Sequence, residues 1–209
     1  LQFWDLLEKG NRYLEGVITL READPLDRTW KILNQWIAGD GGWWGYAKVL
    51  IEKYGLVPAS VMPETKNNKD TRVLSKVLAE LLRSKATEIL RESDQGSKET
   101  ILRKIKEGAM EDVFRFLSLN LGVPPSEFEW RHEKQKKSKG GKKNGVKQDR
   151  LTALKKYTPQ SFFKQTVGLE LSEYHCLFHA PDRPFGKHYV FEEQYCTVGA
   201  DEMNFVNLD

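Results

Sequence analysis

The sequence predicts an α+β fold, with helices in the first part of the chain and short strands towards its end. Two observations lead to this prediction. Apolar side chains recur at helical spacing through most of residues 3–121, whereas short apolar runs after residue 173 are separated by a proline-rich turn. The composition agrees, because 39% of the 209 residues are hydrophobic and 11% are aromatic, which suits a globular protein with a hydrophobic core.

Five segments have the spacing of amphipathic helices, and residues that break helices follow them. Gly55 ends the third segment, Ser93–Gly96 separate the fourth from the fifth, and Gly122 ends the fifth. The fourth pattern is the clearest, because its Val and Leu side chains form a single stripe. The expected helices cover residues 3–20, 27–37, 43–54, 70–92 and 97–121.

A short strand and a further helix are expected between residues 122 and 170. Phe128 and Trp130 alternate with charged residues, which predicts a short exposed strand. Thr158 and Pro159 suit a helix start, because Thr caps the first turn and Pro needs no hydrogen-bond acceptor there. The apolar residues expected to face inward from this helix are Phe162, Phe163 and Val167.

The last part of the chain has the pattern of strands. Tyr174–Phe178 and Tyr189–Phe191 are apolar or aromatic runs, and the turn Pro181–Pro184 lies between them. No stretch reaches the ~20 apolar residues that a membrane-spanning helix needs, so no membrane contact is expected. Leu1 falls directly on a helical pattern, and we therefore expect the chain to be an internal segment of a longer polypeptide.

Positive charge is concentrated in one segment. Lys134 to Lys147 contain seven Lys and no acidic residue, although the net charge of the whole chain is only +3. A solvated loop is the first interpretation. A weak contact with nucleic acid or another polyanion is the alternative, although the segment has no Arg and no interleaved aromatic residue for base stacking.

Cys176 is the one residue in a setting that suggests catalysis. It lies between His175 and His179, but a strand would direct both imidazoles to the face opposite the thiol, so a half-buried core thiol is the expected role. A zinc site is the alternative, although the spacing of its candidate ligands matches no compact zinc module. These candidates are Cys176, His179, His188 and Cys196. Two Cys in a chain of 209 residues favour a reducing compartment over a disulfide framework.

Several motifs, taken in order along the chain, resemble the bleomycin hydrolase/aminopeptidase C family, a branch of the papain-like cysteine peptidases. Those that carry the resemblance are Phe3–Asp5, Asp40–Trp44, Ile51–Pro58, Val61–Thr65, Gly122–Pro125, Tyr157–Phe163 and Ala180–Phe185. They span nearly the whole chain. Each is weak alone, but their order and spacing together make the resemblance strong.

The resemblance implies a papain-like fold with an added helical region. Residues 1–62 would belong to the helical lobe, residues 63–160 to a helical insertion, and residues 161–209 to the start of the β-rich lobe. The family's catalytic Cys precedes the segment matching Leu1, and its His and Asn follow the segment matching Asp209. No catalytic residue is therefore assigned within this chain, which we expect to be inactive alone.

The resemblance also implies what the parent protein does. It would be a thiol-dependent aminopeptidase that acts on peptide substrates without a metal or an organic cofactor. The family is cytoplasmic and commonly hexameric. The alternatives are an inactive pseudo-peptidase that serves as an interaction module, and a protein that binds polyanions through the Lys-rich segment.

The Gly-Gly pair is the candidate substrate-binding segment. In papain-like enzymes this segment runs beside the substrate, and glycine permits close backbone approach. The candidate contacts are Asp40, Gly41, Gly42 and Trp43. A simple turn between two helices is the alternative. The family usually reads Asp-Gly-Gly-Gln-Trp-Asp, so Trp43 in place of Gln is expected to reshape the pocket.

Overall fold

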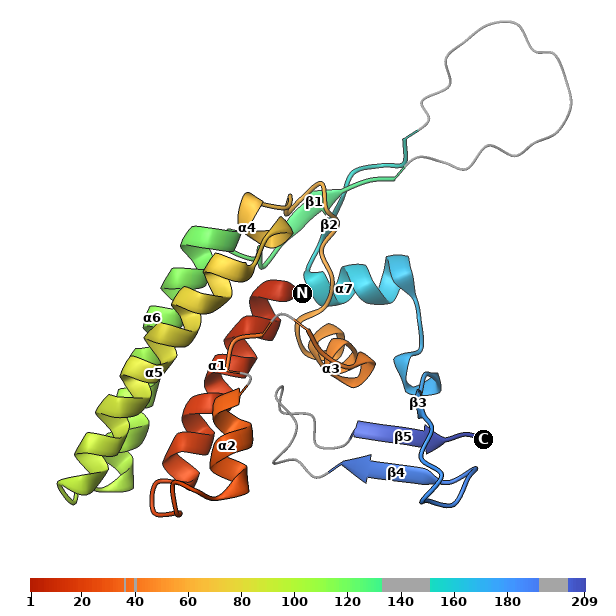
Figure 1. The fold of residues 1–209 in the computed structure, drawn as a ribbon. Helices are drawn as coiled ribbons and strands as arrows, with labels where there is room; N and C mark the ends of the chain where they lie inside the picture. Colours follow the sequence, from red (N-terminus) through yellow and green to blue (C-terminus); the bar gives the residue numbers. More distant parts are fainter. Residues whose placement is uncertain (36, 40, 133–150, 192–202) are drawn as a thin grey trace, which may run out of the picture.

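The computed structural model describes residues 1–35, 37–39, 41–132, 151–191 and 203–209 (Figure 1). Three long helices form its main body: α1 (Gln2–Thr19), α5 (Arg72–Asp94) and α6 (Glu99–Leu121). Each packs against the other two. The shorter helices α2 (Arg28–Gln35) and α3 (Trp44–Tyr54) lie against α1, and α4 (Lys66–Lys69) lies against α6.

The strands form two small sheets. In the first, β1 (Phe128–Trp130) pairs antiparallel with β2 (Lys155–Tyr157). In the second, β5 (Met203–Asn207) lies between β3 (Cys176–Phe178) and β4 (His188–Phe191), parallel to β3 and antiparallel to β4. Three short helical elements lie between the sheets in sequence: α7 (Pro159–Phe162), a π-helical turn (Phe163–Val167) and a 3-10 turn (Leu171–Glu173). The α+β prediction is confirmed.

The largest core lies between α1, α5 and α6. Leu side chains from all three helices are fully buried there, and each contributes about 1.5–3 kcal/mol through its removal from water. Representative members are Leu6, Leu14, Leu78, Leu82 and Leu117. These helices were expected from their apolar stripes, and the five predicted helices are all present, with ends within two residues of those expected.

Two predictions about exposure are wrong. Phe128 is only 8% exposed, because the ring packs against Tyr157 of β2 and Phe162 of α7. Val167 is 37% exposed, although it was expected to face inward. The π-helical turn explains this, because an extra residue in the turn shifts the positions that follow away from the apolar face of α7. The helix start at Thr158 is confirmed, since its hydroxyl accepts a hydrogen bond from the Ser161 N–H at 3.1 Å.

Asn207, on β5, fixes the loop between β3 and β4. Its side chain is fully buried, and Nδ2 donates to the carbonyls of Ala180 and Arg183 at 3.0 and 2.9 Å. Oδ1 accepts from the Ala180 N–H at 2.9 Å. The predicted turn Pro181–Pro184 is therefore closed by a side chain from a strand that the sequence patterns did not predict.

Asn207→Ala is expected to lower the free energy of unfolding by about 2–4 kcal/mol, because it removes a fully buried side chain and leaves part-buried backbone groups of the turn without this partner. The measurement is the thermal unfolding midpoint of the full-length polypeptide. Asn11→Ala, at a half-buried asparagine of α1, is the control and should change stability by less than about 0.5 kcal/mol. Equal effects of the two substitutions would contradict this role for Asn207.

Gly55 joins the end of α3 to α7. Its φ is +73°, and a Cβ there would lie only 2.2 Å from the carbonyl carbon of Pro159. The next N–H, of Leu56, donates to the Pro159 carbonyl at 3.1 Å. Glycine is therefore required both by the backbone conformation and by the close approach of a second backbone.

Gly55→Ala is expected to destabilise the protein by about 2–4 kcal/mol, since strain at positive φ adds to a clash with backbone atoms. Gly96→Ala is a matched control, because φ is +78° there but no atom lies within 4 Å of the added Cβ. The control should cost about 1 kcal/mol. Thermal unfolding of both variants separates the two effects, and equal losses would show that α7 yields to the added methyl group.

Candidate functional site

The Gly-Gly segment lies on the surface just before α3. Gly41, Gly42 and Trp43 are exposed, and α3 begins at Trp44. The expected fourth member of the segment, Asp40, lies outside the described residues. The structure therefore places three of the four candidate contacts next to one another, on a stretch of exposed backbone.

A buried lysine of α1 binds this segment from beneath. Lys9 is 5% exposed, and its ammonium donates to the carbonyls of Gly39 and Gly41 at 2.6 and 2.8 Å. It also pairs with Asp5, one helical turn earlier, at 2.6 Å. Three acceptors match the three N–H groups of an ammonium, so the charge is buried with its hydrogen-bonding capacity satisfied.

The neighbouring residue of α1 holds the other end of α3. Glu8 is 6% exposed, and its carboxylate accepts hydrogen bonds from Lys53 at 2.5 Å and from the Tyr54 hydroxyl. The hydrogen bond that Lys53 donates to Glu8 raises the pKa of Lys53, and burial together with Glu8 raises the pKa of Tyr54. The Tyr54 ring also stacks on Trp4, with centroids 4.0 Å apart and parallel planes.

The two glycines differ in their surroundings. A Cβ on Gly42 would lie 2.8 Å from the ring of Tyr46, whereas a Cβ on Gly41 would meet no atom within 4 Å. Gly42 therefore lies directly over the first turn of α3, and the space over Gly41 is open. Exposed backbone of this kind can pair with an extended peptide through N–H and C=O groups.

Aromatic side chains border the segment on the side of the second sheet. Trp43 is 62% exposed, and its ring meets Phe205 of β5 edge-on at 5.9 Å. Trp44 lies 5.9 Å from Tyr174, which precedes β3. The surface beside the glycine backbone is therefore apolar and aromatic, which suits side chains of a bound peptide.

Cys176 has the role of a core residue, as predicted. Its half-buried thiol packs with Tyr46, Leu50 and Phe205 beneath the start of α3. Of the two histidines near it in sequence, His179 uses Nδ1 in a 2.9 Å contact with the Leu208 carbonyl.

Three of the four candidate zinc ligands, Cys176, His179 and His188, lie within the described residues. Among the residues that the structure describes, no three His, Cys, Asp or Glu side chains gather in a way that could hold a metal ion. His175 and His188 lie near each other, with ring centroids 5.5 Å apart. The remaining candidate, Cys196, lies outside the described residues, as do Lys134 to Lys147.

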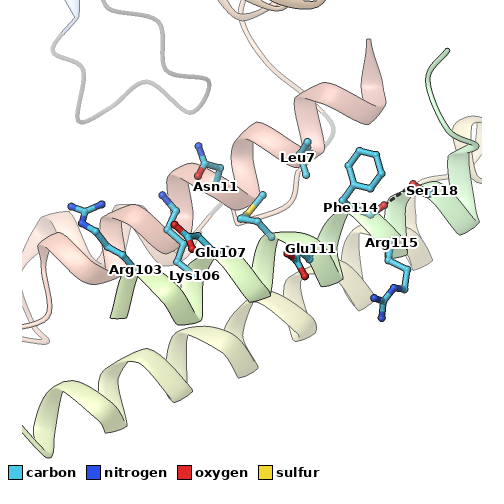
Figure 2. A pocket seen from close by; sticks show the side chains of 10 residues that line it. Leu7, Asn11, Arg103, Lys106, Glu107, Glu111, Phe114, Arg115 and Ser118 are labelled. Carbon is cyan, nitrogen blue, oxygen red and sulfur yellow. Dashed lines mark hydrogen bonds between the residues drawn. The ribbon is translucent and has the colours of Figure 1, made fainter. Parts of the chain in front are cut away.

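A hollow lies elsewhere, between α1 and α6 (Figure 2). It has a volume of about 870 Å³, and Leu7 and Asn11 line it from α1. These residues are two positions from Lys9, roughly 200° around the helix, so the hollow and the Gly-Gly segment lie on opposite sides of α1. Two of the three cationic residues that line the hollow, Arg103 and Lys106, bind Glu15 at 3.0 and 2.6 Å. None of its lining residues is Cys or His.

Several site residues were missed by sequence reasoning. The sequence patterns did not single out Lys9 or Glu8 as site residues, although the i, i+4 spacing of Asp5 and Lys9 is visible in the sequence. Phe205 was missed because no strand was expected around it.

In the described ranges, no helix is both long and apolar enough to cross a membrane.

Comparison with known proteins identifies relatives of the whole chain. The model of the peptidase C1-like family matches residues 1–209. Aminopeptidase C from Streptococcus thermophilus is 35% identical over 209 residues, and aminopeptidase C from Lactococcus lactis subsp. lactis is 35% identical over 212. In both cases the match covers 99% of this chain and 44% of the relative.

A solved structure shares the fold. The crystal structure of PepW from Lactobacillus rhamnosis HN001 superimposes with a TM-score of 0.85 and 30% sequence identity, over 100% of this chain and 44% of that protein. This chain thus spans less than half the length of these relatives. The match confirms the papain-like α+β fold that the motifs predict. The chain belongs to the peptidase C1-like family.

Proposed function

We propose that this chain is the internal part of a cysteine-type aminopeptidase, which removes N-terminal residues from peptides by thiolate attack. The observation that carries the proposal is the exposed Gly41–Gly42 backbone, held from beneath by the buried Lys9. The named relatives support the same activity, since two of them are called aminopeptidase C. The catalytic Cys, His and Asn are expected outside these residues.

The proposed substrate-binding wall consists of Asp40, Gly41, Gly42 and Trp43. A peptide lying along it would pair with backbone groups and would need no side chain from the two glycines. Trp43 stands beside Phe205, so a substrate side chain at this point would meet an aromatic surface. This contact supports a preference for apolar substrate residues there.

The remaining parts of the proposal rest on the family resemblance. Residues 1–62 would form part of the helical lobe, residues 63–160 the insertion, and residues 161–209 the start of the β-rich lobe. The parent protein would be cytoplasmic and would assemble as a hexamer. A molar mass by light scattering, measured on the full-length polypeptide, tests the assembly.

The full-length polypeptide is expected to hydrolyse aminoacyl-coumarin amides, and iodoacetamide should abolish this activity by alkylating the nucleophilic thiol. The 209-residue chain should have no activity, because the groups that carry out the attack are expected outside it. Activity in the short chain would return attention to Cys176. A folded but inactive full-length protein would instead favour a pseudo-peptidase.

Gly42→Ala in the full-length polypeptide is expected to lower kcat/KM by about tenfold or more, because the added methyl group contacts Tyr46 and displaces the backbone that faces the substrate. Gly108→Ala is the control, since a Cβ at this glycine of α6 would meet no atom within 4 Å. The control should keep the wild-type kcat/KM. Steady-state kinetics on an aminoacyl-coumarin amide check both, and an unchanged Gly42→Ala enzyme would exclude this segment from the substrate site.

A further inference from the structure

We infer that Lys9 is a positioning residue for the substrate-binding wall, because its ammonium fixes the direction in which the Gly41–Gly42 peptide group faces. The inference rests on the proposed function of that segment. Lys9 is distant from it in sequence, by 30 residues from Gly39 and by 32 from Gly41. In the described part of the segment, it contacts the backbone oxygens of Gly39 and Gly41.

The hydrogen bond from Lys9 determines the direction in which the Gly41–Gly42 peptide group faces. The Gly41 carbonyl accepts from Lys9 at 2.8 Å, and Lys9 is buried, so this oxygen points into the protein. The peptide bond that follows is trans, and in a planar trans peptide the C=O and the next N–H point in opposite directions. The Gly42 N–H therefore points away from Lys9, towards the exposed side, where an extended peptide could accept it.

Among the residues that the structure describes, few other contacts hold this part of the segment in place. Glycine has no side chain to pack, and the space around a Cβ at Gly41 is empty to 4 Å. At the other end of α3, by contrast, Glu8 binds two side chains and Trp4 stacks on Tyr54. In the described part of the chain, the hydrogen bonds from Lys9 are thus the contacts that orient the glycine backbone.

The buried charge in turn depends on the segment. An ammonium removed from water must be fully hydrogen-bonded, and two of the three acceptors of Lys9 are carbonyls of this segment. Any other backbone orientation at Gly41 would leave the charge incompletely paired. Lys9 therefore favours one conformation of the wall before a substrate arrives, which lowers the entropy cost of binding.

The test compares Lys9→Met with Lys106→Met in the full-length polypeptide. Lys106 is a matched control, because it is also largely buried and also bonds a carboxylate of α1, Glu15, at 2.6 Å, but on the far side of that helix. The measurements are kcat and KM on an aminoacyl-coumarin amide, the rate at which iodoacetamide alkylates the catalytic thiol, and the thermal unfolding midpoint.

Lys9→Met is expected to lower kcat/KM by about tenfold, mainly through KM, while the alkylation rate stays within about twofold of wild type. Lys106→Met should keep the wild-type kcat/KM, even if it lowers the unfolding midpoint as much as Lys9→Met does. Lys9→Arg should restore most of kcat/KM, because a guanidinium can also donate to both carbonyls. If the role of Lys9 were purely structural, Lys9→Met and Lys106→Met would have the same kcat and KM.

The outcomes separate the two proposals. If Gly42→Ala is impaired but Lys9→Met behaves like Lys106→Met, the role of Lys9 is overturned and the substrate-binding segment stands. If Gly42→Ala keeps the wild-type kcat/KM, the proposed segment fails, and the inference about Lys9 fails with it. If Lys9→Met does not fold, Lys9→Gln, which keeps one amide donor group, decides by the same measurements, and an unchanged kcat/KM overturns the inference.

Discussion

A helix that is enclosed on almost every side must bury charged residues as well as apolar ones, and α1 does so at Glu8 and Lys9. Both charges are satisfied by partners far along the chain, in and before α3. The positions of α3 and of the Gly-Gly segment before it depend on these buried ionic contacts. Because an unpaired buried charge is strongly unfavourable, these contacts fix the position of α3 relative to α1 more specifically than apolar packing alone would.

The other faces of α1 show why the helix cannot rotate. Leu6 and Leu14 lie in the core formed with α5 and α6, and Glu15 binds Lys106 and Arg103 of α6. Burial raises the pKa of Glu15, but hydrogen bonds from these two cations more than offset this, so its pKa is lowered overall. A rotation about the helix axis would break apolar and ionic contacts together. The direction in which Lys9 points is therefore set by the core.

The helices were predictable because their apolar residues repeat with the helical period, and so was the capped start of α7 at Thr158. The error at Val167 comes from a local π-helical turn, whereas the other failures arose where a distant element decides the outcome. Phe128 is buried by β2 and α7, and β5 gains its order from neighbours that precede it by many residues. The family motifs indicated Gly41 and Gly42, but periodicity could not reveal the backbone contacts of Lys9. These contacts depend on how the backbone folds at Gly39 and Gly41, and the sequence of side chains does not encode that in a regular pattern.

The order of strands in the second sheet has a consequence for biosynthesis. The central strand, β5, is the last of the three to be made, and among the described residues the two outer strands of this sheet are hydrogen-bonded to β5 and not to each other. A ribosome releases β3 and β4 well before Met203–Asn207, so their edges stay unpaired during that interval. Asn207 also arrives last, and only then can its amide close the loop at Ala180 and Arg183. The three described strands can thus pair only after the helices of the main body have been synthesised.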